Sequence, residues 1–342
     1  MLRVALDAMG GDDGPRPAIE GAVLAAQKHN LEVVLVGKPR HLERLLKAHK
    51  VNDSRISIVE ATDVITMEDS PRKTLARKDS SLAVATRLVK EGKADALVSA
   101  GNTGAVLAHT LFSWRTVGGI RKPAIATFLP THEDRVIVID AGANVDCKPH
   151  QLVQFAVMGS AYARHVLRRE RPRVALLSNG EEPTKGNEAT IEAHQILKTT
   201  DLNFLGNAEG GDVFRGEIDV ITCDGFTGNV LLKASEGLAS TLFGLIKREV
   251  RKSVLMSAAA VLMTPAFKAI KRRTDYDEYG GAPLLGVDGV AIVAHGRSNK
   301  KAYMNAIRVA AECHQLQLVK RLDEALQRNE QQIRAAEGGE AT

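Results

Sequence analysis

The stretch "ALVSAGNTGAVLA" spans residues 96–108 and joins an apolar run, a glycine turn and a second apolar run. The first run is short and apolar almost throughout, which is typical of a buried parallel strand. The second run has the composition of a helix. The same design recurs in "IDVITCDGFTGNV" at residues 218–230. A strand that passes through a glycine turn into a helix predicts an α/β fold.

Short apolar runs of this kind alternate with helical patterns along the chain. The predicted strands cover residues 2–8, 31–37, 55–61, 94–100, 135–142, 173–180 and 218–225, with one more ending at His295. The predicted helices include residues 15–29, 39–50, 80–92 and 150–170. This alternation predicts a mostly parallel sheet covered on both faces. We expect one domain over residues 1–322, then a charged helix end and a disordered tail over 323–342.

The composition narrows the classes of partner. A net charge of +5 permits an anionic substrate, and an aromatic content of 4% argues against a base-stacking surface, so no nucleic-acid partner is expected. The cysteines, Cys147, Cys223 and Cys313, lack metal-ligand spacing, and neither a metal nor a cofactor is expected. Dinucleotide, P-loop, zinc-protease and serine-hydrolase motifs are absent from the sequence. The N-terminus shows no signal-peptide pattern, which favours a cytoplasmic protein.

Residues 250–274 form a segment of unusual composition. Its apolar core, from Val254 to Met263, is too short to span a bilayer. Basic residues flank this core at positions 251, 252, 268, 271, 272 and 273. One interpretation is a helix packed in the core or at a dimer interface. The other is a protruding helix that lies on a membrane surface or docks on a partner.

Glycine turns at the strand ends are the candidate functional loops. In an open parallel sheet, ligands bind beyond the carboxyl ends of the strands, where glycine amides and helix N-termini favour anions. The turn from Gly101 to Gly104 therefore predicts an oxyanion site, with Asn102 and Thr103 as side-chain donors. The alternative is a plain helix N-cap, for which Asn and Thr are also favoured.

Two further residues lie in similar loops. Lys185, in "SNGEEPTKGNE" (178–188), is placed to pair with phosphate as a point charge; the alternative is a solvated loop lysine. His295, at a strand end, can donate a hydrogen bond or a proton near neutral pH; the alternative is a structural role. Ser298 or Asn299 is expected to cap the next helix. Cys223 is predicted to be a core residue, and no covalent intermediate on the protein is indicated.

Six sets of motifs, in a fixed order, carry a family resemblance. They are "DAMGGD", "SAGNTGA", "DAGANVDCKP", "NGEE" with "KGN", "DGFTGNVLLKASEG", and "YGGAPLLGV" with "AHGRS". Together they resemble the bacterial phosphate acyltransferase family of phospholipid synthesis over about residues 1–320. The resemblance implies a three-layer α/β/α sandwich with a cleft, similar to phosphotransacetylases and isocitrate-type dehydrogenases. It also implies a homodimer with peripheral membrane association, through residues 250–274.

The resemblance further implies a reaction. Acyl-[acyl carrier protein] and inorganic phosphate give acyl phosphate and free carrier protein, and the acyl phosphate feeds a membrane glycerol-3-phosphate acyltransferase. The residues assigned to substrate binding are Gly101, Asn102, Thr103, Gly104, Lys185 and Thr227. The residues assigned to catalysis are Asp224, Asn229, His295 and Ser298. The last two are placed near the leaving thiol, by similarity to a strand–loop–helix unit of phosphotransacetylases.

Other interpretations stay open at the level of sequence. An acyl-CoA-using phosphotransacylase and a decarboxylating dehydrogenase would share the fold. A non-catalytic scaffold that links carrier protein to the membrane belongs to another class. The carrier protein is acidic, so its docking candidates are the basic clusters at residues 164–171, 247–252 and 268–273.

Overall fold

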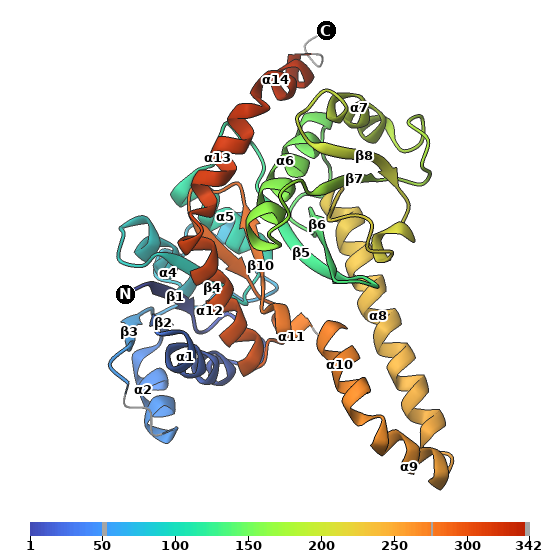
Figure 1. Ribbon diagram of the computed structural model, residues 1–342. Helices are drawn as coiled ribbons and strands as arrows, with labels where there is room; N and C mark the ends of the chain where they lie inside the picture. Colours follow the sequence, from blue (N-terminus) through green and yellow to red (C-terminus); the bar gives the residue numbers. More distant parts are fainter. Residues whose placement is uncertain (50–52, 275, 339–342) are drawn as a thin grey trace.

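The computed structural model describes residues 1–49, 53–274 and 276–338, and its described strands form one 11-stranded sheet (Figure 1). The first half holds β1 (Arg3–Asp7), β2 (Glu32–Gly37), β3 (Ile56–Glu60), β4 (Ala96–Ser99) and β11 (Val290–Val293), all parallel. The second half holds β6 (Arg135–Ile139), β7 (Arg173–Leu177), β8 (Asn203–Ala208) and β9 (Val220–Thr222), also parallel. Two antiparallel strands, β5 (Ala124–Pro130) and β10 (Ala282–Leu285), join the halves.

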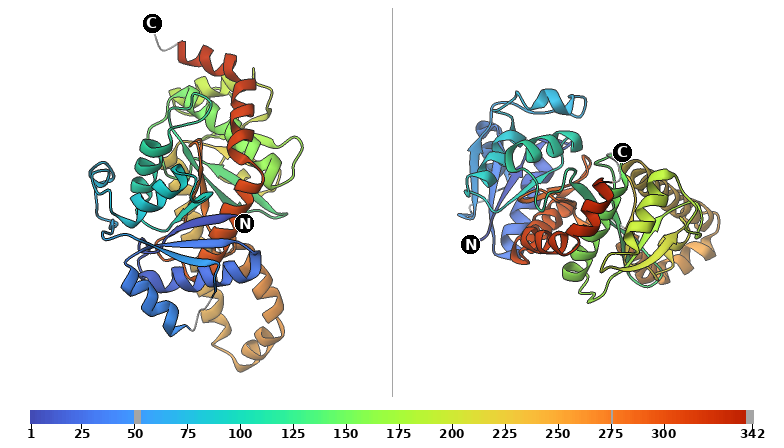
Figure 2. Two further views of the ribbon diagram at one scale, coloured as in Figure 1. Left: turned by 90° about the vertical axis from the view of Figure 1, so that its left-hand side faces the viewer. Right: turned by 90° about the horizontal axis from the view of Figure 1, so that it is seen from above.

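Helices cover both faces of the sheet, which confirms the predicted three-layer α/β/α arrangement (Figures 1 and 2). One side of the first half carries α1 (Pro15–His29), α2 (Pro39–Ala48) and α12 (Lys300–Gln315). The other side carries α3 (Pro71–Thr74), α4 (Ser81–Lys90) and α5 (Thr103–Trp114). The second half carries α6 (Pro149–Val166), α7 (Glu188–Leu197), α13 (Leu318–Arg328) and α14 (Glu330–Gly338), with η1 (Asp212–Phe214) and the start of α8 (Gly225–Val250) opposite.

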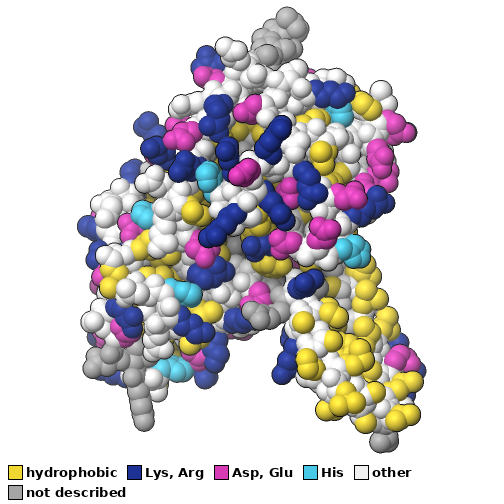
Figure 3. Space-filling model, in the orientation of Figure 1, with side chains coloured by type: hydrophobic (Ala, Val, Ile, Leu, Met, Phe, Trp, Pro, Cys, Tyr) yellow, Lys and Arg dark blue, Asp and Glu magenta, His cyan; other side chains and the backbone are white. Residues whose placement is uncertain are grey.

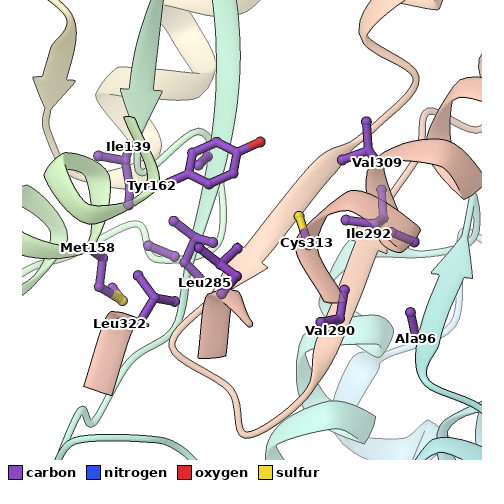
Figure 4. Close-up of a cluster of buried hydrophobic side chains, with 14 of the residues drawn as sticks. Ala96, Ile139, Met158, Tyr162, Leu285, Val290, Ile292, Val309, Cys313 and Leu322 are labelled. Atoms are coloured by element: carbon purple, nitrogen blue, oxygen red, sulfur yellow. The ribbon is translucent and has the colours of Figure 1, made fainter. Parts of the chain in front are cut away.

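The side-chain alternation of the strands explains this layering. On β1, Leu6 packs with Ile19 of α1, while the intervening Ala5 packs with Leu82 of α4. Strands with apolar residues in both positions require helices on both faces. A single cluster of buried side chains continues from the first half into the second. Figure 4 shows part of it, where Leu285 of β10 lies near Met158 of α6.

Order extends further toward the C-terminus than the sequence predicts. Residues 318–328 and 330–338 form α13 and α14, whereas we expected a helix end and a disordered tail from residue 323. The physical reason is burial, because Leu322, Leu326 and Ile333 are 2%, 2% and 6% exposed in the core. The end of the predicted tail, residues 339–342, lies outside the described residues.

A helical arm projects from the second half of the sheet. It consists of α8, α9 (Val254–Leu262) and α10 (Thr264–Thr274), and α11 (Tyr276–Tyr279) leads back to the sheet (Figure 1). Apolar side chains cover the arm (Figure 3), and Leu255 and Leu262 are 80% and 84% exposed. The interpretation of residues 250–274 as a helix packed in the core is therefore wrong for this chain. Among the described residues, no helix has the length and apolar character needed to cross a bilayer.

Candidate functional site

A cleft of about 540 Å³ lies where the two halves of the sheet meet. β10 pairs with β11 through residues 282–283 and with β5 through residues 284–285, so the two halves are offset along the strand direction. The offset brings carboxyl ends from both halves to one cavity. The first half contributes Asp12, Gly101, Thr103, Val293, Ala294, His295 and Gly296. The second half and its helix α8 contribute Ala141, Gly142, Asn229, Leu232, Lys233 and Glu236.

The N-terminus of α5 forms one wall of this cleft. Asn102 is its N-cap, and the Oδ1 atom accepts a hydrogen bond from the Ala105 amide at 3.0 Å. The Asn102 Nδ2 atom donates to the carbonyl oxygens of Met67 and Asp69, both at 3.0 Å. The Asn102 side chain therefore positions the loop rather than a ligand, as in the N-cap alternative. First-turn amides have no acceptor within their helix, so those of Thr103 and Gly104 are the donors that α5 offers.

A buried chain of hydrogen bonds orients this turn from below. The Gly101 amide donates to Ser99 Oγ at 3.1 Å, and Ser99 Oγ donates to Asp7 Oδ2 at 2.8 Å. Burial raises the pKa of Asp7, although hydrogen bonds to its carboxylate, that from Ser99 among them, oppose the shift. The motif that begins at Asp7 thus supports the turn, and its Asp12 reaches the cleft.

The loop after β6 forms the facing wall and folds around Asp140. The Asp140 carboxylate is 0% exposed and accepts hydrogen bonds from the amides of Ile125, Gly142, Ala143 and Asn144, and from Asn144 Nδ2. Burial raises the pKa of Asp140, while the amide donors act to lower it. One carboxylate therefore holds the whole loop that carries Gly142 to the cleft.

Asp224 is the N-cap of helix α8, whose first turns line the cleft. Asp224 accepts hydrogen bonds from the amide and the hydroxyl of Thr227, at 2.8 and 2.7 Å. Neither residue is among the described residues that line the cleft, whereas Asn229 is. Gly228, between Thr227 and Asn229, allows close packing, because a Cβ at this position would lie 1.9 Å from the carbonyl oxygen of Asp140.

His295 and Ser298 follow β11, but only His295 lines the cleft. The His295 ring accepts a hydrogen bond from the Arg297 amide on Nδ1, at 3.1 Å. This bond places the proton of the neutral ring on Nε2. Ser298 is 2% exposed, and the cap of α12 is Asn299, whose Oδ1 accepts from the amides of Lys301 and Ala302.

Lys185 lies apart from these residues. It is exposed in the loop after β7, where its amide donates to the Glu182 carbonyl at 3.0 Å. The described residues that line the cleft do not include Lys185, and they contain a different cation, Lys233 of α8. The Lys233 Nζ atom lies 3.0 Å from Glu236 Oε2. The structure thus brings together Gly101, Thr103, Asn229 and His295 of the expected set.

Comparison with known proteins decides the family. Residues 2–321 match the family model described as "Fatty acid synthesis protein". A phosphate acyltransferase from Pelotomaculum thermopropionicum is 50% identical over 312 residues, which cover 91% of each chain. The chain belongs to the phosphate acyltransferase family. Another phosphate acyltransferase, from Heliobacterium modesticaldum, is 51% identical over 313 residues, covering 91% of this chain and 93% of its own.

Membership of the phosphate acyltransferase family makes the chain an enzyme and confirms the resemblance drawn from the motifs. The fold has relatives of lower sequence identity. A phosphotransacetylase from Streptococcus pyogenes superposes with a TM-score of 0.64 at 18% identity, covering 93% of this chain and 94% of that one. A 4-hydroxythreonine-4-phosphate dehydrogenase from Klebsiella pneumoniae gives a TM-score of 0.54 at 15% identity, covering 92% and 99%. These likenesses confirm the predicted fold class.

Lys233 is one of the cleft residues of this phosphate acyltransferase that were not predicted from the sequence, together with Asp12 and Glu236. It lies in the motif "DGFTGNVLLKASEG", four residues after Asn229 and three before Glu236. Residues three and four apart share one face of a helix, so the position of Asn229 implies that both neighbours face the same way. Applying the helical period to this motif would have found Lys233.

A loop over residues 62–80 closes one side of the cleft. Arg77 Nε lies 2.6 Å from Asp63 Oδ2, Arg77 Nη1 lies 2.6 Å from Asp69 Oδ2, and Met67 from this loop lines the cleft. The Asn102 amide holds the same loop against α5. Two independent contacts therefore fix the position of Met67.

Asn102→Ala is expected to loosen this loop and to remove the cap of α5. We expect a loss of about 1 kcal/mol in the free energy of unfolding, together with a raised KM for the acyl substrate. Urea denaturation and steady-state kinetics measure the two effects. Asn102→Asp keeps the capping oxygen and should recover the stability but not the KM. An unchanged KM in Asn102→Ala would contradict a role for the loop in the cleft.

Proposed function

We propose that this enzyme transfers an acyl group from the thioester of acyl-[acyl carrier protein] to inorganic phosphate. The products are acyl phosphate and free carrier protein. The observation that carries the proposal is the composition of the cleft in a member of this family. Anion donors at the start of α5, the cation Lys233 and the imidazole of His295 line the same cavity as apolar residues such as Leu232 and Val293.

The proposed reaction balances without an acyl-enzyme. An oxygen of hydrogen phosphate attacks the thioester carbonyl, so a C–O bond forms and the C–S bond breaks when the oxyanion collapses. Phosphate is substantially dianionic at neutral pH, by analogy with phosphoester second pKa values of about 6. Hydrogen phosphate loses one proton and the departing thiolate gains one, so the numbers of protons and charges are the same on both sides. The protein has to position the reactants and stabilise charge.

Each wall of the cleft then has a role in the proposal. The amides of Thr103 and Gly104 and the Thr103 hydroxyl hold the phosphate, with Lys233 in place of the expected Lys185 as counter-charge. Asn229 orients the reacting carbonyl from the facing wall. The Nε2–H group of His295 donates a hydrogen bond that stabilises the developing thiolate, and the thiolate takes its proton from the hydrogen phosphate or from solvent. Asp224, Thr227 and Ser298 act behind these groups, by capping α8 and supporting the loop after β11.

Cysteine substitutions test the absence of an acyl-enzyme. Burial raises the pKa of Cys147 to about 12, and burial raises the pKa of Cys223 well above its usual range. Because the thiolate is the nucleophilic form, neither cysteine is activated. Cys147→Ala is expected to keep kcat within about twofold of the wild type, and iodoacetamide at neutral pH should leave turnover unchanged. A radiolabelled acyl group that stays on the denatured protein would contradict the direct transfer.

The central experiment measures phosphate-dependent release of thiol from palmitoyl-[acyl carrier protein], with hydroxylamine to trap acyl phosphate. The proposal requires release that depends on phosphate and yields a trapped hydroxamate. Palmitoyl-CoA in the same assay tests the alternative substrate, since a higher kcat/KM with CoA would favour that phosphotransacylase. Absence of trapped product with either thioester would contradict the transfer itself.

The acyl phosphate formed is a reactive mixed anhydride, so its consumer is expected close by. We propose that it feeds a membrane glycerol-3-phosphate acyltransferase and that the enzyme works in the cytoplasm as a homodimer at the membrane surface. The arm supports both contacts because apolar residues are exposed both along α8 and at the tip. Those on α8 include Leu238, Leu242, Leu245 and Ile246, and those on α9 at the tip include Leu255, Val261 and Leu262.

Two double variants separate these contacts. Leu242→Asp with Ile246→Asp is expected to convert a dimer to a monomer, because negative charges of like sign would be buried between the two copies. Leu255→Asp with Leu262→Asp is expected to abolish sedimentation with anionic phosphatidylglycerol vesicles while the dimer persists. Analytical ultracentrifugation and vesicle sedimentation measure the two outcomes. Vesicle binding that survives the second double variant would remove the membrane role of the tip.

A further inference from the structure

We propose that a second cavity, at the edge of the sheet opposite the cleft, binds a small organic phosphate ester. The cavity has a volume of about 440 Å³ and lies between α6, α13 and the starts of β7 and β8. Lys and Arg side chains gather on this side of the molecule (Figure 3). No role in acyl transfer requires this cavity, so the inference stands independently of the proposed function.

The walls of this cavity combine guanidinium groups with an apolar floor. Arginines reach it from three elements, namely Arg164 of α6, Arg171 before β7, and Arg321 and Arg328 of α13. Guanidinium groups bind phosphate oxygens in pairs of parallel hydrogen bonds. Buried Val157, Ala161 and Ala325 line the same cavity and give a non-polar surface. An ester, with a phosphate and an organic body, matches both surfaces better than inorganic phosphate.

The acidic residues of the cavity leave these guanidinium groups able to bind. The Arg321–Glu324 and Arg328–Asp201 pairs are long, at 3.9 Å each, beyond hydrogen-bond distance. Asp201 instead accepts a hydrogen bond from Asn329 Nδ2 at 2.8 Å. Among the described residues, Arg164 and Arg171 have no ion-pair partner. Their donors therefore remain for a ligand.

Arg169, unlike Arg164 and Arg171, lies beside carboxylates of the protein. It lies 3.6 Å from Asp219 Oδ1 and 3.8 Å from Asp134 Oδ2, and it is not among the described residues that line the cavity. The basic cluster at residues 164–171 thus divides into structural and cavity-lining members. The cavity-lining members alone face the proposed ligand.

His165 adds a pH-sensitive group to the cavity. Burial lowers the pKa of His165, and the charges of Arg321 and Arg164 lower it further. The charged groups that line the cavity around it are Arg164, Glu170, Arg171, Asp201, Arg321, Glu324 and Arg328. A bound phosphate would oppose the arginine charges and raise the pKa, so binding takes up a proton. Affinity is then expected to rise as the pH falls from about 8 to about 7, above the second pKa of the phosphate ester at about 6.

The position of the cavity excludes direct delivery of substrate from it. Helix α6 starts beyond the β6 loop that lines the cleft and ends at the cavity, and its 18 residues span about 27 Å. A carrier protein docked at Arg164 would sit a helix length from the reacting groups. The occupant that the geometry favours is therefore a small molecule bound apart from the transfer.

Isothermal titration with AMP, adenosine and pyrophosphate tests the proposal. We expect AMP to bind at one site, adenosine not to bind, and pyrophosphate to bind more weakly than AMP. Arg164→Ala with Arg321→Ala should weaken AMP binding at least about tenfold, because charge-assisted hydrogen bonds are lost. Lys320→Ala, which removes a charge from α13 outside the cavity, should have no effect. His165→Ala should remove the rise in affinity between about pH 8 and about pH 7, leaving only the weakening that follows protonation of the phosphate ester near its second pKa of about 6.

A cleft variant separates this cavity from the catalytic site. Thr103→Ala should leave AMP binding intact, whatever it does to turnover. Binding that disappears in Thr103→Ala but survives in the double arginine variant would place the ligand in the cleft and overturn the proposal. Failure of both AMP and pyrophosphate to bind the wild type at millimolar concentrations and low salt would overturn it as well.

Discussion

His295→Ala is expected to lower kcat for thiol release by about 10²–10³-fold, with little change in the KM for phosphate. The reason lies in the hydrogen bond from the Arg297 amide to His295 Nδ1, which fixes the neutral ring with its proton on Nε2. That proton is the one the proposal aligns with the departing sulfur. Stopped-flow detection of released thiol, over a range of phosphate concentrations, separates the effect on kcat from that on KM.

The leaving group gives this prediction a sharper test. An acyl thioester of a nitrothiophenol releases a stable thiolate that needs no hydrogen bond in order to leave, so it should restore most of the rate lost in His295→Ala. A purely structural defect would slow both thioesters equally. His295→Gln, which keeps an N–H donor, should fall between the wild type and the alanine variant. A kcat within threefold of the wild type in His295→Ala would contradict the role of this residue in transfer.

Asp140→Ala is expected to reduce the free energy of unfolding by about 3–5 kcal/mol. The carboxylate is 0% exposed and accepts five hydrogen bonds at 2.7–3.1 Å, four from the loop and one from the Ile125 amide of β5. Alanine would strand these donors in the interior, where each unsatisfied group is costly. Chemical denaturation followed by circular dichroism measures the loss, which corresponds to a fall in melting temperature of about 10 °C.

Two matched variants control for this effect. Asp140→Asn keeps the shape but places an NH₂ group opposite the Asn144 donors, so it should recover less than half of the loss. Asp146→Ala removes an exposed carboxylate from the same loop and should stay within about 0.5 kcal/mol of the wild type. A loss below 1 kcal/mol in Asp140→Ala would show that the loop holds itself without the carboxylate.

Most of the parallel strands could be predicted, because continuous apolar runs such as residues 96–99 have a distinctive composition. The edge strand β8 was not predicted, because its sequence NFLGNA is mostly half-buried and is not a continuous apolar run. β5 and β10 were not predicted either. β5 carries half-buried Thr127 and Phe128, and β10 is a four-residue strand that contains Pro283. These two antiparallel strands connect the halves of the sheet. The offset that brings strand ends of both halves to one cleft therefore could not be predicted.

The residues of the candidate site also include some whose position could be predicted and some whose position could not. Gly101, Thr103 and His295 lie close after strand ends, and Asn229 lies in the second turn of the helix after β9; all four line the cleft, as the rule for parallel sheets predicts. Lys185 also follows a strand end, but that of β7, two places along the sheet from β6. Distance across a sheet depends on strand order, which local sequence does not reveal. Asn102 and Asp224 were recognised by residue type, which capping and ligand binding share.

Helix α8 has a mechanical consequence. Its first turns carry Asn229 and Lys233 into the cleft, and its far end carries the exposed arm, with 26 residues in one unbroken helix. A helix of that length is a stiff rod of about 39 Å. Whatever clamps the tip therefore also restrains the orientation of one cleft wall. Because one stiff helix carries both the tip and this wall, fixing the tip to another body is expected to restrict movement of the wall.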